Sequence, residues 1–288
     1  MNAILALEDG TWYRGVAAGA AGETSGEVVF NTAMTGYQEI LTDPSYCRQI
    51  VTLTYPHIGN YGTHDGLDES RQPHVAGFVA REFTAQASHW SSTAALGQYM
   101  SSRGVFGLDQ IDTRALVRHL REVGACRGVI STQDLSPKAL VARAKQSASM
   151  VGADLAREVT CDKPYPWPGA TPGTRRVALL DFGVKRNILR MLAARGCSIT
   201  LVPAQTSARE VLALAPDGIF LSNGPGDPEP CDYAIDAARE LINQGIPTFG
   251  ICLGHQIMAL ASGAKTLKMK FGHHGANHPV QDLDTKKV

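Results

Sequence analysis

Residues 249–256 read Phe-Gly-Ile-Cys-Leu-Gly-His-Gln, and they mark a point where an apolar strand gives way to a helix. Residues 246–251 form the apolar run expected of a buried strand, and residues 253–261 carry apolar side chains at helical spacing. Cys252 therefore lies at a strand-to-helix turn, which lifts its side chain to the rim of a sheet. The unpaired N–H groups and the dipole of the helix N-terminus predict a thiol that ionises readily.

Two roles are open to Cys252. Gly250 and Gly254 flank it and leave the backbone bare, so that a substrate carbonyl can approach the sulfur, which favours a nucleophile. A lone cysteine is more often a buried structural residue, and without the two glycines that role would be the better interpretation. With the glycines present, the nucleophile is favoured.

A second loop follows another apolar run, residues 217–222, and reads Asn223-Gly224-Pro225-Gly226-Asp227-Pro228. Its glycines and prolines restrict the backbone and present bare N–H groups, which suits an oxyanion hole or a cradle for a ligand carboxylate. A plain turn is the alternative for this loop taken alone. Two such loops after parallel-type strands favour a ligand site, because ligands bind outside the carboxyl ends of strands in open α/β sheets.

The two loops together resemble the class I, or triad, glutamine amidotransferases, which hydrolyse glutamine at a cysteine. Four further segments resemble, more narrowly, the family of small, glutamine-hydrolysing subunits of carbamoyl-phosphate synthase. These segments are residues 31–39, 41–46, 54–60 and 181–188. The resemblance extends over essentially all 288 residues.

The chain is predicted to have two domains. Residues 161–175 hold four prolines and two glycines, which cannot continue a helix or a central strand, so this segment is expected to be a linker. Residues 1–160 are expected to form a mixed α/β domain that contacts the large subunit and contributes to the glutamine site. Residues 176–288 are expected to form the class I glutamine amidotransferase domain, with a doubly wound, mainly parallel sheet.

Periodicity predicts individual elements in both domains. In the first, a helix over 112–123 has Asp112 as its N-cap, Gly124 beyond its end, and one apolar stripe of Leu116, Val117, Leu120 and Val123. Strands are predicted there at 4–7, 27–30, 49–54 and 75–79. In the second domain, strands are predicted at 177–180, 199–202, 218–221 and 246–251, and helices at 187–194 and 253–261.

The resemblance implies roles for particular residues. Cys252 matches the nucleophile that forms a glutamyl thioester, and the backbone N–H of Leu253 matches an oxyanion-binding group. Gly224 and Gly226 match the loop that binds the oxyanion and the substrate. Two further positions match glutamine-binding side chains: Gln256, one turn into the nucleophile's helix, and Ser45, which reaches across from the first domain.

The chain departs from the family in one respect. The triad also requires a histidine as general base and a glutamate to orient it, near the carboxyl end of the domain. No glutamate follows Glu240, and the last histidine, His278, matches another position. His255, three positions beyond Cys252 on its helix, is poorly placed as the base. The chain is therefore expected to be truncated, with an incomplete amidotransferase domain that stops at 286–288 inside the start of another strand, and to hydrolyse glutamine very slowly.

Two motifs suggest other chemistry. Asp181-Phe182-Gly183 copies a kinase tripeptide, but no glycine-rich loop accompanies it, so a strand-to-helix turn is expected. His273, His274 and His278 have metal-ligand character, yet no cysteine or glutamate lies near them in the sequence, and no metal is expected. No cofactor is expected on this chain; the resemblance implies that ATP, Mg²⁺ and bicarbonate are used by the large subunit.

Composition excludes several classes of protein. Lys+Arg and Asp+Glu are equal at 27, so no basic surface for nucleic acid is expected. The six cysteines form no C-x-x-C pair, which fits reduced thiols in a cytoplasmic protein. No stretch approaches the about 20 apolar residues of a membrane span, and no signal peptide is evident.

The expected activity is glutamine hydrolysis that supplies ammonia to a large subunit, which makes carbamoyl phosphate for arginine and pyrimidine synthesis. Two alternatives stay open. One is another triad amidotransferase, such as one serving anthranilate or GMP synthesis, although residues 34–44 and 55–60 argue against it. The other is a non-catalytic partner that docks on the large subunit without turning over glutamine.

Overall fold

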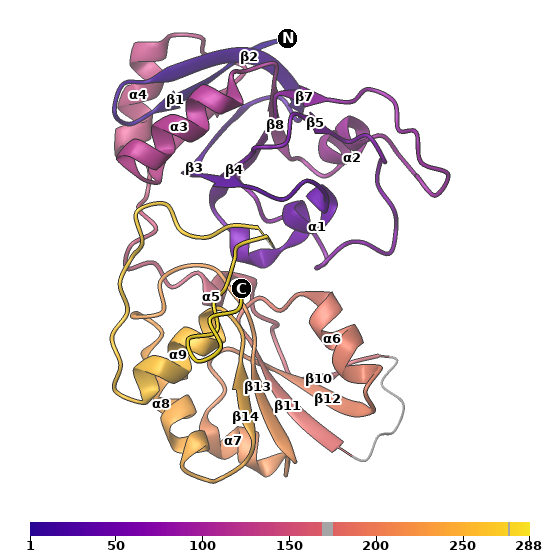
Figure 1. Ribbon diagram of the computed structural model, residues 1–288, viewed down its shortest axis with the longest axis vertical. Helices are drawn as coiled ribbons and strands as arrows, with labels where there is room; N and C mark the ends of the chain where they lie inside the picture. The colour runs from indigo at the N-terminus through magenta and orange to yellow at the C-terminus, as the bar shows by residue number, and fades with distance from the viewer. Residues whose placement is uncertain (169–174, 276) are drawn as a thin grey trace.

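The computed structural model describes residues 1–168, 175–275 and 277–288. Residues 169–174, in the predicted linker, lie outside the described residues. The chain forms an upper part built on a barrel and a lower part built on an open sheet, with the C-terminal segment lying in front of the junction in this view (Figure 1).

Seven strands close the barrel in the order β1-β2-β8-β6-β4-β3-β9. Their bounds are β1 Asn2–Leu7, β2 Trp12–Gly19, β3 Glu23–Asn31, β4 Gln49–Leu53, β6 Gly77–Val79, β8 Phe106–Asp109 and β9 Cys126–Ser131. The run β3-β4-β6-β8 is parallel, and the remaining pairs are antiparallel. A short pair, β5 His57–Ile58 and β7 Glu82–Phe83, lies beside the barrel.

Helices cover the barrel and share its core. Their bounds are α1 Tyr37–Thr42, α2 Leu96–Ser102, α3 Thr113–Val123, α4 Pro137–Gln146 and α5 Ala156–Val159, with a 3-10 turn, η1, at Pro44–Tyr46. Alternation along β1 explains the packing: Leu5 faces a cluster that includes Leu116 of α3, whereas Ile4 faces Leu140 of α4. Each face of one strand is thus buried against a different helix.

The predicted helix over 112–123 is confirmed as α3. The Asp112 carboxylate accepts a hydrogen bond from the Ala115 N–H at 2.9 Å, and Gly124 follows the last helical residue with a φ of 104°. The prediction that Val123 belongs to the buried stripe was wrong, since this residue is 50% exposed. The last turn of the helix extends beyond the core that buries Leu116 and Leu120.

The lower part holds five strands in the order β10-β12-β11-β13-β14. Their bounds are β10 Tyr165–Pro166, β11 Arg175–Asp181, β12 Cys197–Pro203, β13 Gly218–Leu221 and β14 Thr248–Gly250. Every pair is parallel except β10 with β12, so the predicted mainly parallel sheet is confirmed. Two residues of the predicted linker, Tyr165 and Pro166, form that antiparallel edge strand, where a proline is tolerated.

Helices pack on both faces of this sheet, as expected for a doubly wound fold (Figure 1). They are α6 Arg186–Ala193, α7 Ala208–Ala213, α8 Asp232–Ile242 and α9 Leu253–Ala261. Leu180 of β11 packs in the cluster of α7, α8 and α9, whereas its neighbour Leu179 packs in the cluster of α6. α7 begins with a capping box in which Ser207 and Glu210 exchange hydrogen bonds.

Two further expectations concern the end of the chain. The predicted strand at 246–251 is only three residues long, β14, and its Phe249 is 62% exposed at the sheet edge. The prediction that a strand begins at 286–288 was wrong. Residues 282–287 instead form a turn, in which the Asp282 N–H donates to the Lys287 carbonyl at 2.9 Å.

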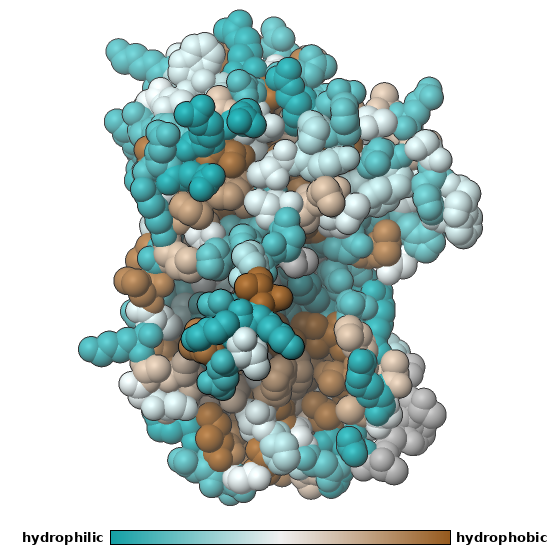
Figure 2. Space-filling model, in the orientation of Figure 1, coloured by the Kyte–Doolittle hydropathy of each residue, from teal (hydrophilic) through white to brown (hydrophobic). Residues whose placement is uncertain are grey.

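Among the described residues, no helix combines the length and the apolar character needed to cross a bilayer. The surface mixes hydrophilic and hydrophobic side chains, with a hollow visible between the upper and lower parts (Figure 2).

Candidate active site

Cys252 occupies a strained turn between β14 and α9. Its φ of 54° and ψ of −112° fall outside the regions that non-glycine residues ordinarily adopt. Strain of this kind persists only where the surroundings enforce it, and the sharp strand-to-helix turn that carries a nucleophile is a recurrent example. The residue is exposed, so the predicted position at the rim of the sheet is confirmed.

The sulfur faces two backbone donors. The N–H of Leu253, the first residue of α9, and the N–H of Gly224, in the loop after β13, both lie beside the thiol and act to lower its pKa. Gly224 follows β13, and Leu253 follows β14. Because these two strands are parallel neighbours, their carboxyl ends bring the two N–H groups together beside the sulfur. Such a pair can stabilise the oxyanion that forms when a nucleophile attacks a carbonyl.

The Cys252 pKa is raised, so the prediction of a readily ionised thiol was wrong. Desolvation is the largest cause and the Asp43 carboxylate adds to it, whereas the two N–H donors and Lys185 act in the opposite direction. Protein groups from both parts of the molecule surround the opening in which the sulfur lies, and this loss of hydration outweighs the helix N-terminus.

The two glycines beside Cys252 have a packing role. A Cβ on Gly254 would lie 2.2 Å from the Leu221 carbonyl oxygen, and one on Gly250 would lie 2.6 Å from the Gly254 carbonyl carbon. Glycine is therefore needed for α9 to approach β13 closely. The two glycines thus hold the helix against the sheet, and the expectation that they also clear a path for substrate stays a prediction.

The loop after β13 brings one of its two predicted glycines to the sulfur. Gly224 lies against the turn after β11, where a Cβ would approach the Phe182 carbonyl oxygen to 2.2 Å. Gly226, with a φ of 88°, packs instead against Ala153 and Leu155. Gly224 thus presents its N–H to the site, and Gly226 shapes the loop.

Ser45 comes from the upper part and meets the same loop. It lies in η1, and its N–H donates to the Asp43 carboxylate at 2.9 Å, which fixes the turn. The Asn223 side-chain amide donates to the Ser45 hydroxyl oxygen at 3.0 Å. Residues 178 positions apart are thereby joined next to Gly224.

Asn223, Asp43 and Lys185 belong to this junction but were missing from the sequence-based site. Lys185 Nζ lies 3.4 Å from the Asp43 carboxylate, and Asn223 is 2% exposed. Lys185 lies within residues 181–188, which resemble the family, and Asn223 is the first residue of the glycine-rich loop. Both residues therefore lie in segments that the sequence already marked as functional. Their partners come from distant segments and could not be read from spacing.

Gln256 is exposed on the first turn of α9, and its backbone N–H donates to the Cys252 carbonyl at 3.0 Å. His255 beside it is also exposed. The contact of Gln256 with glutamine stays a prediction.

The histidine segment lies against the upper part. The His274 ring is 5.8 Å from that of Tyr46, the residue after Ser45, and the His274 carbonyl accepts from the Thr32 N–H. Burial lowers the pKa of His274. Within residues 1–168, 175–275 and 277–288, no group of three or more His, Cys, Asp or Glu side chains is arranged to hold a metal ion.

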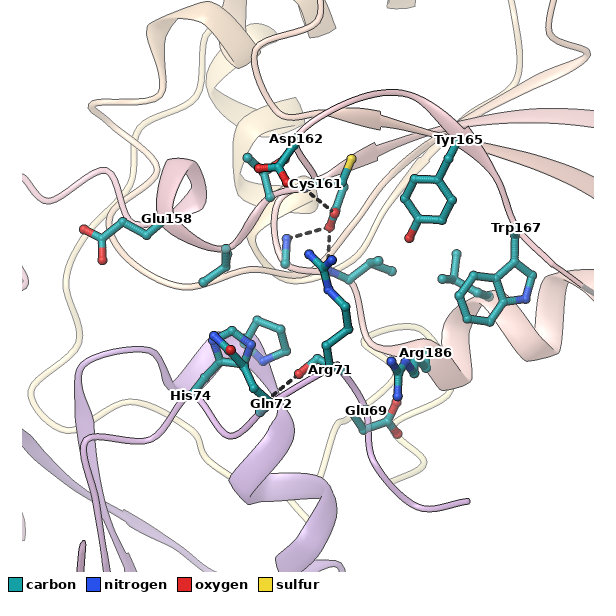
Figure 3. Close-up of a pocket in the computed structure, with 18 of the residues that line it drawn as sticks. Glu69, Arg71, Gln72, His74, Glu158, Cys161, Asp162, Tyr165, Trp167 and Arg186 are labelled. Carbon is teal, nitrogen blue, oxygen red and sulfur yellow. Dashed lines mark hydrogen bonds between the residues drawn. The ribbon is translucent and has the colours of Figure 1, made fainter. Parts of the chain in front are cut away.

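A cavity of about 580 Å³ lies on the other side of the junction and shares Pro44 and Gly183 with it. Arg71 extends from the upper part into this cavity, and Tyr165 and Trp167 line the far wall (Figure 3). Asp181 also lines it: its carboxylate accepts hydrogen bonds from the N–H groups of Cys161, Gly183 and Val184. Asp181-Phe182-Gly183 is thus a strand-to-helix turn, as predicted.

Comparisons with known proteins agree with this geometry. Residues 5–130 match the family described as the carbamoyl-phosphate synthase small chain, CPSase domain, and residues 178–288 match glutamine amidotransferase class-I. The chain is 57% identical to a protein of Thioalkalivibrio sulfidiphilus named carbamoyl phosphate synthase small chain, over 99% of this chain and 79% of that protein. Proteins with the same name from Polynucleobacter asymbioticus (99% and 78% covered) and Vibrio vulnificus (100% and 80% covered) are 58% and 55% identical.

Proposed function

The chain belongs to the carbamoyl-phosphate synthase small-chain family, and we propose that it is the glutamine-hydrolysing amidotransferase subunit of that enzyme. The observation that carries the proposal is the strained strand-to-helix turn that holds Cys252, with the Leu253 and Gly224 N–H groups beside its sulfur. The match of residues 5–130 to the small-chain domain argues against an amidotransferase of another pathway.

The chemistry begins when the Cys252 thiolate attacks the side-chain carboxamide carbon of glutamine. The carbonyl oxygen becomes an oxyanion, which the Leu253 and Gly224 N–H groups stabilise. Collapse of this intermediate, with a proton delivered to the leaving nitrogen, releases ammonia and leaves a glutamyl thioester on the sulfur. Water then hydrolyses the thioester to glutamate and regenerates the thiol.

Glutamine binding is assigned to Ser45, from the upper part, and to Gln256, on α9. Ser45 is held by Asn223 at the edge of the upper part, and Gln256 is exposed one turn along α9. The Gly224–Gly226 loop lies between the two parts and supplies backbone rather than side chains to the substrate. These roles concern binding, so their loss should affect glutamine use more than any reaction that starts from free ammonia.

The partner in this proposal is the large subunit of carbamoyl-phosphate synthase, which would receive the ammonia and use ATP, Mg²⁺ and bicarbonate. The half-reaction proposed for this chain needs only nucleophile, proton transfers and water, so we assign it no cofactor. The six cysteines among the described residues are free thiols, which supports a location in the reducing cytoplasm.

The test is a single-turnover reaction of the protein with glutamine, quenched in acid and analysed by peptide mass spectrometry. A glutamyl adduct on the peptide that carries Cys252, together with released ammonia, is expected. Glutamine should also protect Cys252 from alkylation. Tight docking on the large subunit with neither an adduct nor ammonia would instead support the non-catalytic alternative.

A further inference from the structure

We propose that Asn223 is a positioning residue that sets the orientation of the Ser45 hydroxyl and its distance from the Gly224 N–H. The inference rests on the proposed function, because it assigns Ser45 and Gly224 to glutamine binding and oxyanion stabilisation. It concerns a side chain that touches neither the sulfur nor, in this account, the substrate.

The Asn223 amide joins three loops at once. Its Nδ2 donates to the Ser45 hydroxyl oxygen at 3.0 Å and to the Gly183 carbonyl oxygen at 2.9 Å, with the Asp43 carboxylate at 3.5 Å. Its Oδ1 accepts from the Lys185 N–H at 3.1 Å. A planar amide offers two N–H hydrogens and one carbonyl oxygen, so these contacts use both its donor and its acceptor sides.

The loops that it joins are themselves rigid. The Asp181 carboxylate holds the turn at Gly183 through two backbone N–H groups, and the Asp43 carboxylate caps the turn that carries Ser45. Gly183 is closely packed and leaves no room for a side chain, since a Cβ there would lie 2.8 Å from Val159 and 2.9 Å from Pro44. Asn223 therefore hydrogen-bonds to two turns that are themselves held in place. These hydrogen bonds set the position of the next residue, Gly224, relative to Ser45.

The direction of the hydrogen bond gives Asn223 a second effect. Because Nδ2 donates to the Ser45 oxygen, the Ser45 hydroxyl hydrogen is left to point elsewhere. Ser45 is thus presented as a donor, which suits an acceptor on the substrate, a carboxylate or a carbonyl oxygen, rather than its ammonium group. An aspartate at 223 would reverse this arrangement by accepting the Ser45 hydrogen.

The test compares two alkylating reagents on Cys252. A chloroketone analogue of glutamine must bind through the glutamine contacts before it reacts, whereas iodoacetamide needs only an accessible thiolate. Asn223→Ala should slow inactivation by the analogue by about 10-fold, the size of one lost hydrogen bond in a buried network, and Asn223→Asp should slow it further. Iodoacetamide labelling of Cys252 should stay within about 2-fold in Asn223→Ala. In Asn223→Asp the added carboxylate also disfavours the thiolate, so the rate with the analogue is compared there relative to the rate with iodoacetamide. Asn243→Asp, at the exposed C-cap of α8, is the matched control and should leave both rates unchanged.

A double-mutant cycle with Ser45→Ala identifies the route of the effect. If Asn223 acts through Ser45, the double variant should react with the analogue about as slowly as the slower single variant. A double variant whose fold-decrease in rate equals the product of the two single decreases would overturn the proposal. An Asn223→Ala variant that reacts normally with the analogue would also overturn it.

The remaining outcomes separate folding and function. Equal loss of both reactivities in Asn223→Ala and in the isosteric Asn223→Asp, with lowered thermal unfolding temperatures, would show a merely structural role and overturn the proposal. A wild-type Cys252 that does not prefer the glutamine analogue over iodoacetamide would overturn the proposed function itself.

Discussion

The barrel and the open sheet divide the work of the site unequally. The barrel closes on itself through seven strands and offers the site one short turn, η1, with Ser45. The sheet is open, and the ends of β13 and β14 leave Gly224 and Cys252 at its carboxyl edge. Backbone N–H groups just beyond the ends of strands are free to bind a ligand. In a closed barrel, the N–H groups along the strands are hydrogen-bonded to neighbouring strands. The sheet therefore carries the bond-making groups, and the barrel contributes a contact to bound glutamine.

The largest effect should follow removal of the sulfur nucleophile. Cys252→Ser is expected to lower the release of ammonia in the first turnover at least about 10³-fold, because no other group of the site replaces the thiolate. The measurement is single-turnover ammonia release at saturating glutamine, since steady-state hydrolysis by this chain is expected to be very slow. Cys197→Ser, at the start of β12, is the control and should retain activity. Activity lost equally in both variants would mean that the effect is on folding rather than chemistry.

The second prediction removes a sheet donor without touching the sulfur. Gly224→Ala forces a Cβ against the Phe182 carbonyl oxygen and displaces the Gly224 N–H. Loss of one oxyanion donor is expected to lower kcat about 10²- to 10³-fold. Gly97→Ala in α2 of the barrel, where a Cβ meets nothing within 4 Å, should leave kcat unchanged and raise stability by about 1 kcal/mol. A Gly224→Ala variant with normal kcat would remove Gly224 from the chemistry.

The raised pKa of Cys252 predicts the pH dependence of its reactivity. Burial favours the neutral thiol, so the thiolate fraction is small at pH 7 and increases as pH rises toward and beyond the ordinary thiol pKa. Iodoacetamide labelling of Cys252 should therefore increase about tenfold per pH unit between pH 7 and 8.5. A plateau below pH 7.5 would show instead that the helix N-terminus prevails over desolvation.

Even so, Cys252 is expected to be the most reactive thiol at neutral pH. Burial raises the pKa of Cys47 to about 11 and those of Cys126, Cys161 and Cys231 to about 12, and Cys252 is the exposed one of the six free cysteines. Limited labelling followed by peptide mapping should find Cys252 modified first. Preferential labelling of Cys47, Cys126 or Cys197 would contradict the assignment.

The smallest effects should come from the binding side chains. Ser45→Ala and Gln256→Ala are each expected to raise KM for glutamine by an amount equivalent to about 0.5–1.5 kcal/mol while changing kcat little. In a complex with the large subunit, synthesis from ammonia should be unaffected. A fall in kcat for Ser45→Ala as large as that for Gly224→Ala would erase the difference between barrel and sheet.

Local signals predicted parts of both regions well. The helix over 253–261 and the strand over 218–221 have the predicted bounds, and Asp112 caps α3, because each depends on residues close in sequence. Barrel closure was not predicted: pairing β1 with β9 joins segments more than a hundred residues apart, and short strands such as β8 carry little periodicity.

The site shows the same limit. Spacing along the chain identified Cys252 as the nucleophile candidate, yet it gave the wrong direction for the pKa shift. Burial and the charge of the Asp43 carboxylate raise the pKa, and both arise only when the chain folds. Asn223 was missed for the same reason. Its function lies in partners at 45, 183 and 185, which only the tertiary structure brings together.

Trapping the thioester would show whether the sheet performs the chemistry and the barrel only binds glutamine. Wild-type protein, Ser45→Ala and Cys252→Ser would each be mixed with glutamine at increasing concentration, quenched in acid and mapped by mass spectrometry. We expect the same maximal glutamyl adduct on Cys252 in wild type and Ser45→Ala, reached at higher glutamine in the variant, and none in Cys252→Ser. An adduct on another cysteine, or a Ser45→Ala variant that forms none at any glutamine concentration, would contradict it.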